Sequence, residues 1–277
     1  MGNDLIADAL SPVARAAKLV LVNARAALFD LYGDHLRPRG GRATVAALVR
    51  LLAPLEIAAP AVRTAVSRMV RQGWLVPVRL PQGPGYGITR KCATRLDEAA
   101  LRIYRAGTLA WSGRWHLIVF EPVRDRARRE RLRADLAFLG YAPISETTWV
   151  GPRASGELDG LLAGVRNDRF EAVLEGDPRE LVARAWDLAG IGQAYETWLA
   201  DAVTMVGSLP FDATRDEVFA TRSRLVHGWR NFLFRDPGLP AELLPAGWPG
   251  EKARAYFEYE AARLMPAAAA FVDEELQ

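Results

Sequence analysis

The pattern of apolar and polar positions is clearest at residues 60–75, which read PAVRTAVSRMVRQGWL. At ~100° of rotation per residue, a helix gathers the apolar side chains into one arc and the basic and hydroxyl side chains into the opposite arc. Pro60 suits a first helical turn, and Gly73 is typical of the residue after a helix end. The pattern therefore predicts a helix over 60–72. Its apolar back consists of Val62, Ala65, Val66, Met69 and Val70. Its front consists of Arg63, Thr64, Ser67, Arg68 and Arg71.

An isolated helix of this kind is more often a solvated surface helix, so the neighbouring segments decide its role. Apolar spacing predicts a helix over 12–36, which RPRGG at 37–41 ends. Thr44 is placed to cap a short second helix, VAALVRLLAPL. WLVPVRL and YGITRKC have strand composition, and PQGPG between them reads as a turn. Three helices followed by a hairpin are typical of a winged helix-turn-helix, whose third helix enters the major groove of DNA.

Strands and helices alternate in the middle of the chain. The segments are, in order, RWHLIVF, RDRARRERLRADLAFLG, YAPISETTWVGP, ELDGLLAGV and RFEAVLEGD. They read as a strand, a helix, one or two strands, a helix and a strand. This order predicts a ferredoxin-like βαββαβ sheet.

The remaining pattern is mostly helical from residue 180 onward, with one Pro/Gly-rich break, RDPGLPAELLPAGWPG. The predicted fold class is thus α+β and multidomain. We expect a winged helix-turn-helix over 1–92, a connecting helix and linker over 93–110, a ferredoxin-like domain over 111–178 and a helical domain over 179–277. The helical domain is the expected site of effector binding and dimerisation.

The distribution of charge supports a polyanionic partner for the N-terminal part. The net charge is only +3, but residues 1–95 hold 14 of the 36 Lys and Arg residues and only 5 of the 33 Asp and Glu residues. The rest of the chain is therefore acidic. A small basic module joined to an acidic remainder is typical of a protein that binds nucleic acid at one end.

Several classes of protein are disfavoured. A single cysteine, Cys92, excludes an intramolecular disulfide and fits a reducing cytoplasm. No apolar run approaches the ~20 residues of a membrane span, and the N-terminus does not resemble a secretory signal. The three histidines lie in three different predicted segments without metal-ligand spacing, and no nucleophile elbow or phosphate-binding loop is present. We therefore expect a cytoplasmic protein with no metal, no cofactor and no catalytic residues.

The motifs and their order resemble the PaaX family, bacterial repressors of the phenylacetic acid degradation pathway. The matching pieces include LYGDHLRPRGG, LVRLLAPLEI, AVRTAVSRMVRQGWL, LGYAPISETTWVGP, AYETWL and RDPGLPAELLPAGWPG. The resemblance covers nearly the whole chain. It implies a DNA-binding repressor, a homodimer, and a middle domain similar to a CRISPR-associated nuclease family. It also implies that phenylacetyl-coenzyme A, or a related aryl thioester, releases the protein from double-stranded operator DNA.

On this resemblance, the front of helix 60–72 is the DNA-reading face. We expect Arg63, Thr64, Ser67 and Arg68 to contact base edges and nearby phosphates, and Arg71 to contact phosphate. The wing departs from the family, because its tip, PQGPG, lacks basic residues. Arg79 and Arg90 flank this tip, so the wing is expected to bind phosphate from its sides or hardly at all.

A coenzyme A thioester needs cationic partners for its phosphates and an apolar lining for its aryl group. The C-terminal third combines aromatic and basic residues, and the candidate effector-binding residues are Trp198, Arg222, His227, Arg230 and Arg235. The alternative for these residues is a packed helical core with surface arginines. Two alternative functions also stay open, a metal-dependent nuclease and an enzyme that processes acyl-coenzyme A. Glu121 stands where a nuclease of the related family would ordinarily have an aspartate, and no thioesterase nucleophile or base pair is evident.

Overall fold

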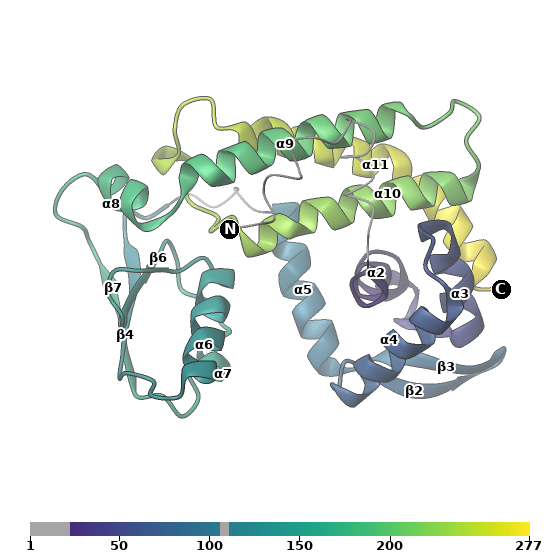
Figure 1. The fold of residues 1–277 in the computed structure, drawn as a ribbon, viewed down its shortest axis with the longest axis horizontal. Coiled ribbons are helices and arrows are strands. Elements are labelled where there is room, and N and C mark those ends of the chain that lie inside the picture. The colour runs from purple at the N-terminus through teal and green to yellow at the C-terminus, as the bar shows by residue number, and fades with distance from the viewer. Residues whose placement is uncertain (1–22, 106–110) are drawn as a thin grey trace, which may run out of the picture. The chain divides into compact units, whose positions relative to one another are not determined.

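The computed structural model describes residues 23–105 and 111–277, which form a mixed α+β structure (Figure 1). The chain divides into two compact units. The first unit draws on Met1–Leu101, Glu196–Arg230 and Lys252–Gln277, and the second on Arg102–Tyr195 and Asn231–Glu251. The first unit thus combines N-terminal elements with much of the C-terminal helical region. Among the described helices, none has both the length and the apolar content needed to span a bilayer.

From residue 23 to 105, the described chain contains four α-helices and three short strands, and all but the last residues of the fourth helix belong to the first unit. In chain order these are α2 (Ala24–Leu31), β1 (Arg42–Thr44), α3 (Val45–Leu52), α4 (Ala59–Arg71), β2 (Leu75–Leu80), β3 (Gly83–Ile88) and α5 (Arg90–Arg105). A π-helical turn, Tyr32–Leu36, prolongs α2, so helix was correctly predicted for residues 24–36. The predicted residues 12–22 lie outside the described part. The Thr44 hydroxyl accepts a hydrogen bond from the N–H of Ala47 at 3.1 Å, which confirms the predicted cap of α3.

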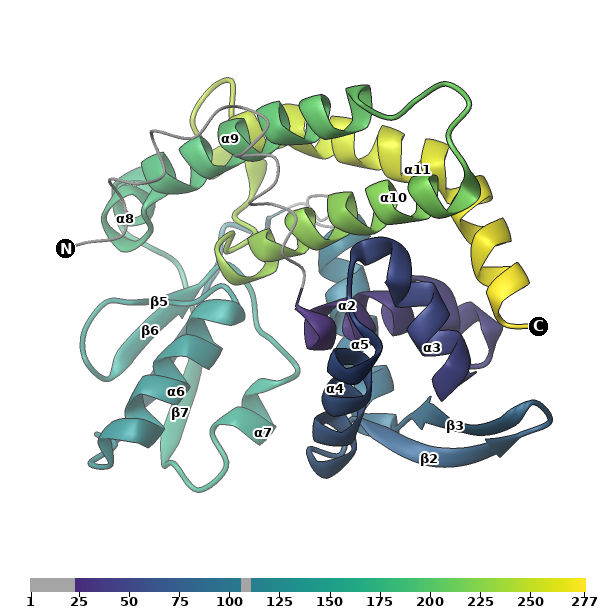
Figure 2. The same cartoon turned by 45° about the vertical axis from the view of Figure 1, so that its right-hand side comes forward.

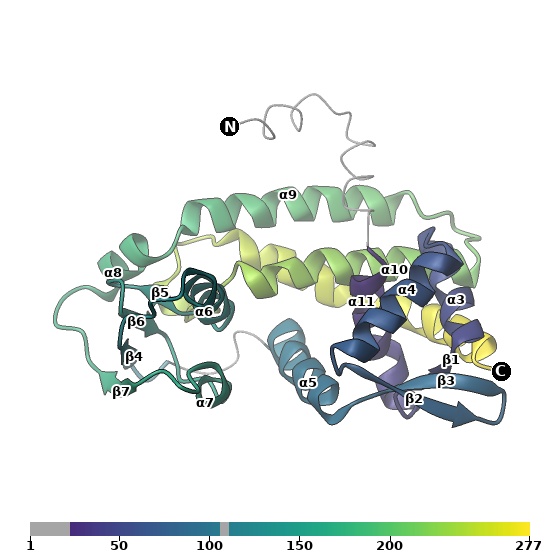
Figure 3. The same cartoon turned by 60° about the horizontal axis from the view of Figure 1, so that its bottom comes forward.

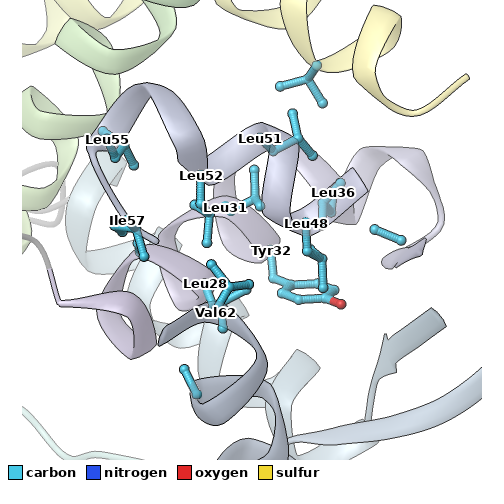
Figure 4. Packing of buried hydrophobic residues seen from close by; sticks show 14 of the residues in the cluster. Leu28, Leu31, Tyr32, Leu36, Leu48, Leu51, Leu52, Leu55, Ile57 and Val62 are labelled. Carbon is cyan, nitrogen blue, oxygen red and sulfur yellow. The ribbon is translucent and has the colours of Figure 1, made fainter. Parts of the chain in front are cut away.

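Helices α2, α3 and α4 enclose a leucine-rich core, shown in Figure 4. The apolar back of α4 belongs to this core, since Val62, Ala65, Val66 and Met69 are all buried and Val70 packs against them. The predicted helix and its apolar face are therefore confirmed. The same burial holds α4 at a fixed rotation about its axis, because turning the helix would expose these side chains.

Strands β1, β3 and β2 form a three-stranded antiparallel sheet in that order (Figure 3). The predicted hairpin is present, but its turn is shorter than expected and β3 already begins at Gly83. Residues 83–85 were expected in the turn, but they pair with residues 78–80 of β2, and Gly85 also pairs with Thr44 of β1. A Cβ atom on Gly85 would lie 2.4 Å from the carbonyl oxygen of Ala43, so only glycine lets β1 approach β3 here.

The C-terminal part of the first unit is helical. It contains α10 (Arg215–Arg230) and long parts of α9 (Leu188–Gly207) and α11 (Pro249–Glu275), which lie side by side in Figure 2. Trp229 links them, because its ring stacks on Phe257 at 4.8 Å and meets the edge of Trp198 at 4.9 Å between centroids. This aromatic cluster is the core of the helical layer.

The second unit is built around a four-stranded antiparallel sheet of order β5-β6-β4-β7. Its elements are β4 (Trp115–Phe120), α6 (Arg126–Phe138), β5 (Ala142–Pro143), β6 (Thr148–Gly151), α7 (Leu158–Leu161), β7 (Asn167–Ala172) and α8 (Pro178–Ala185). Helices α6 and α7 pack on one face of the sheet through a shared apolar core (Figure 1). The other face is covered in part by α8 and the 3₁₀ turn Ala241–Leu243.

The segment predicted as mostly helical from residue 180 onward contains a break that the sequence analysis did not predict. The structure has α8 and then α9 there. The break lies at Trp186, whose backbone is extended. The carboxylate of Asp187 accepts a hydrogen bond from the N–H of Gly190 at 2.9 Å, which caps the new helix.

Candidate nucleic-acid interface

The polar front of α4 is exposed along its whole length. The exposed residues are Arg63, Thr64, Ser67, Arg68 and Arg71. The structure therefore brings together the five side chains that the sequence assigned to the helix front. Three guanidinium groups and two hydroxyl groups face solvent from one rigid helix, whose position is fixed by the core behind it.

The arginines of this face are not neutralised by carboxylates. Within the residues that the structure describes, Arg63, Arg68 and Arg71 form no ion pair, and Arg71 donates a hydrogen bond to the hydroxyl of Ser67 at 2.9 Å. A row of unpaired guanidinium groups attracts a polyanion. Arginine also suits both targets of a DNA-reading helix, since its planar donors match phosphate oxygens and the O6 and N7 atoms of guanine.

Other arginines of the same unit do have acidic partners. Arg50 on α3 is paired with Glu275 near the end of α11. Arg39 donates to both carboxylate oxygens of Asp273, at 2.6 and 2.9 Å, and these hydrogen bonds lower the pKa of Asp273. Arg37 is paired with Asp97. Acidic side chains thus neutralise Arg37, Arg39 and Arg50, whereas the arginines on the front of α4 keep their positive charge.

The hairpin adds basic residues at its sides rather than at its tip. Arg79 on β2 and Arg90 at the start of α5 are both exposed, as is Arg42 on β1. Arg42 was missed by sequence reasoning, because a three-residue strand carries no periodic signal. The sheet register places Arg42 opposite Gly87 of β3, and the side chain of Arg42 lies against this glycine.

Four of the five candidate effector-binding residues lie in the first unit, where each has partners within the protein. Trp198 is buried in the aromatic cluster around Trp229. Arg222 is 2% exposed, is paired with Asp34, and donates through Nε to the carbonyl oxygen of Ala261 at 3.0 Å. Such a buried guanidinium links three elements, because Asp34 follows α2 and Ala261 lies on α11.

His227 and Arg230 share one carboxylate. Nδ1 of His227 lies 2.8 Å from Oδ2 of Asp30, and Arg230 is paired with Oδ1 of the same side chain. Burial lowers the pKa of both residues, that of Arg230 to about 10, so at neutral pH Arg230 is charged and His227 is neutral. A carboxylate can only accept, so the neutral imidazole donates from Nδ1. Arg235, the fifth candidate, is exposed and belongs to the second unit.

No sequence signal pointed to Asp30 and Asp34 as partners of these residues, because about 190 residues separate each carboxylate from the side chains that it binds. The assignment of Trp198, Arg222, His227, Arg230 and Arg235 to an effector stays a prediction. Among the described residues, no group of three or more His, Cys, Asp or Glu side chains is arranged to hold a metal ion.

Comparison with known families covers almost the whole described chain. The model of the PaaX-like protein matches residues 23–91, that of the PaaX protein central Cas2-like domain matches 108–179, and that of the PaaX-like protein C-terminal domain matches 186–274. Among solved structures, an uncharacterized protein from Mycobacterium tuberculosis has a TM-score of 0.56 and 25% sequence identity. That match covers 92% of this chain and 99% of the other.

A curated relative extends the same relationship. The chain is 30% identical over 276 residues to a protein of Escherichia coli (strain K12) named transcriptional repressor PaaX. The match covers 95% of this chain and 87% of the relative. The three family models together match most of the chain, the relative matches 95% of it, and the chain therefore belongs to the PaaX family.

Proposed function

We propose that this protein is a DNA-binding transcriptional repressor of genes for the breakdown of phenylacetic acid or a related aromatic acid. The observation that carries the proposal is the exposed arginine face of α4 in a chain 30% identical to transcriptional repressor PaaX. Its role is regulatory and not enzymatic. Because its target is chromosomal DNA, it acts in the cytoplasm.

The N-terminal elements serve as a winged helix-turn-helix. In support, α2, α3 and α4 are followed by the β2–β3 hairpin, and β1 completes a small sheet, which is the order expected of this motif. Helix α4 then enters the major groove. Arg63, Thr64, Ser67 and Arg68 reach base edges and adjoining phosphates, and Arg71 binds phosphate.

The hairpin is the wing of this motif. Its turn residues, Pro81 and Gln82, carry no charge, whereas Arg79 and Arg90 are exposed beside it. We therefore assign these two arginines to phosphates that flank the major-groove contact.

The sheet of the second unit is ferredoxin-like. Its elements follow the order β4, α6, β5, β6, α7 and β7. Its antiparallel strand order, β5-β6-β4-β7, is that of a βαββαβ unit whose first and third strands are central and whose second and fourth strands lie at the edges. The match to a Cas2-like domain model over 108–179 supports the same reading.

The effector is phenylacetyl-coenzyme A or a related aryl-coenzyme A thioester, and its binding releases the repressor from DNA. His227, Arg230, Trp198, Arg222 and Arg235 are the candidate contacts. The protein acts as a homodimer on a two-fold operator, because one recognition helix gives too little specificity for a single promoter. The effector would favour a dimer whose two α4 helices no longer match successive major grooves.

The experiment is a gel shift on the DNA upstream of the protein's own gene, with random DNA of equal length as competitor. We expect a retarded band that resists the competitor and is lost when phenylacetyl-coenzyme A is added. Free phenylacetate should leave the band in place, since it lacks the nucleotide phosphates. Equal affinity for specific and random DNA would contradict the repressor function, and a band that ignores the thioester would contradict the effector.

A further inference from the structure

We infer that the exposed side of helix α6 is a second DNA-binding surface, which binds the phosphate backbone of double-stranded DNA without reading its sequence. The inference goes beyond the proposed function and rests on it in one respect, because it needs a protein that already binds DNA through α4. It places an additional contact in the second unit, outside the winged helix-turn-helix.

Positive charge is concentrated in one short segment of the second unit. Residues 111–178 contain ten arginines, no lysine and eleven Asp and Glu residues. Six of the ten arginines, but only two of the eleven acidic residues, lie within 124–133. The rest of this stretch is therefore acidic. A basic segment in an otherwise acidic domain creates a local positive potential that attracts a polyanion.

The guanidinium groups of this segment are not neutralised by carboxylates. In the described part of the chain, no arginine of residues 124–133 forms an ion pair, and neither do Glu130 and Asp135 on the same helix. Asp125 serves as the N-cap of α6, because its side chain accepts a hydrogen bond from the N–H of Arg128 at 2.7 Å. The acidic residues of α6 thus leave its arginines charged and available.

The arginines of α6 lie where a long polyanion can reach them. The exposed ones are Arg124, Arg126, Arg128, Arg131 and Arg133. Arg126 and Arg133 are two turns apart on the same side of the helix, about 10 Å along its axis, and Arg129 lies between them. The buried Leu132 and Leu136 attach α6 to the sheet and so fix its rotation. Arg126, Arg129 and Arg133 therefore form a row on a rigid helix, which phosphates can contact in succession.

The remaining exposed side chains of α6 favour a DNA backbone over a protein partner. Ala127, Ala134 and Ala137 are exposed, and α6 exposes no large apolar side chain. Protein interfaces are centred on aromatic or large aliphatic side chains, which this surface lacks. Alanines beside the arginines instead leave room for a phosphate backbone to approach the helix closely.

α6 also lacks the polar side chains that accompany arginine in base reading. Its sequence, RARRERLRADLAF, contains no Ser, Thr, Asn or Gln, whereas the front of α4 carries Thr64 and Ser67. Contacts to phosphate position a protein on DNA but carry no sequence information of their own. The α6 surface therefore increases affinity for any DNA, and α4 selects the operator.

Binding of the full chain to DNA at several salt concentrations tests this surface. In Arg126→Ala/Arg133→Ala, the slope of log K against log salt concentration should fall by about two, because two phosphate contacts are lost. At ~0.1 M salt the affinity should fall roughly tenfold or more, by the same factor for operator and for random DNA. Arg126→Lys/Arg133→Lys should bind nearly like the wild type, because lysine can hold a phosphate as a point charge.

Arg166→Ala/Arg184→Ala is the matched control. It removes two exposed arginines of the second unit that lie outside α6, so the net charge changes by the same amount. The control should keep the salt slope of the wild type. Far-UV circular dichroism should be the same in all these variants, since every substituted side chain is exposed.

The inference is overturned if Arg126→Ala/Arg133→Ala has the salt slope of the wild type, or if the control loses as much affinity. It is also overturned if the alanine variant loses affinity for operator alone, because α6 would then read sequence. Failure of the proposed function looks different. A wild type with equal affinity for operator and random DNA contradicts the repressor function, whereas a reduced slope in the α6 variant still supports the second surface.

Discussion

Nδ1 of His227 on α10 lies 2.8 Å from Oδ2 of Asp30 on α2, and the same carboxylate binds Arg230. One turn further along the chain, Asp34 binds the buried Arg222. Within the first unit, these two carboxylates connect α2 and the π-helical turn that follows it to α10. These ion pairs join side chains of which Arg222 and Asp30 are buried, so their geometry fixes how α2 sits on the C-terminal helices.

Removal of the Asp30 carboxylate should destabilise the first unit. Asp30→Ala leaves the charge of Arg230 and the N–H of His227 without their acceptor in a poorly hydrated site, and we expect a loss of roughly 3 kcal/mol in the free energy of unfolding. Glu274→Ala is the control, since Glu274 pairs with Arg215 while both side chains are more than half exposed, and it should cost under ~1 kcal/mol. Urea unfolding measures both. Equal effects of the two variants would show that the junction does not depend on Asp30.

Acid should weaken the fold through His35. Burial lowers the pKa of His35 from 6.5 to about 4, and Arg222, 3.4 Å from Nε2, acts in the same direction. The stabilisation by neutral His35 is complete above the unfolded-state pKa of 6.5 and is lost as the pH falls towards about 4, because only the unfolded chain takes up the proton in that window. The lowered pKa corresponds to about 3 kcal/mol.

Urea unfolding at several pH values between about 7 and 4 tests this. In His35→Gln the loss of stability with acid should be clearly smaller than in the wild type. Some dependence should remain, because burial also lowers the pKa of His116 and of His227. An unchanged pH profile in the variant would assign the acid sensitivity to other groups.

Single substitutions on α4 should separate base reading from phosphate binding. Arg63→Ala or Arg68→Ala should weaken operator binding by ~1–3 kcal/mol and leave the fold intact, because both side chains are exposed and unpaired. Arg71→Ala should weaken binding to operator and to random DNA alike. It should also reduce the slope of log K against log salt concentration by about one. Arg166→Ala, an exposed arginine of the second unit, is the control. Wild-type affinity in both Arg63→Ala and Arg68→Ala would place the reading face elsewhere.

The part of this surface that was predictable from the sequence is the part set by local periodicity. The apolar and polar arcs of α4 follow from 3.6-residue spacing, and the structure has them where expected. The strand β1 was not predictable in this way, because it consists of three residues held by pairing with β3. The break between α8 and α9 was also missed, since the side chain of Asp187 can cap a helix only once the chain has turned at Trp186.

The junction with α10 was beyond sequence reasoning for a different reason. The density of arginines and aromatic residues near His227 was visible, and it suggested a ligand site. Asp30 and Asp34, which bind these arginines, lie in the first described helical segment, and no local pattern links them to α10. Long-range ion pairs depend on the whole tertiary structure, so their partners become known only with it.

The last prediction separates the candidate effector contacts. Arg235 is exposed, so Arg235→Ala should leave the free energy of unfolding unchanged. If Arg235 holds a phosphate of phenylacetyl-coenzyme A, its loss should remove a charge-assisted contact of roughly 1.5–3 kcal/mol and weaken binding of the thioester at least tenfold. Arg230→Ala should behave differently. It removes the cationic partner of the Asp30 carboxylate in a largely buried site, so it should lower stability even without ligand. Calorimetry with the thioester and urea unfolding of both variants measure these effects. Wild-type thioester affinity in Arg235→Ala would remove Arg235 from the candidates, and unchanged stability in Arg230→Ala would show that its pairing with Asp30 contributes little and leave its guanidinium available to the effector.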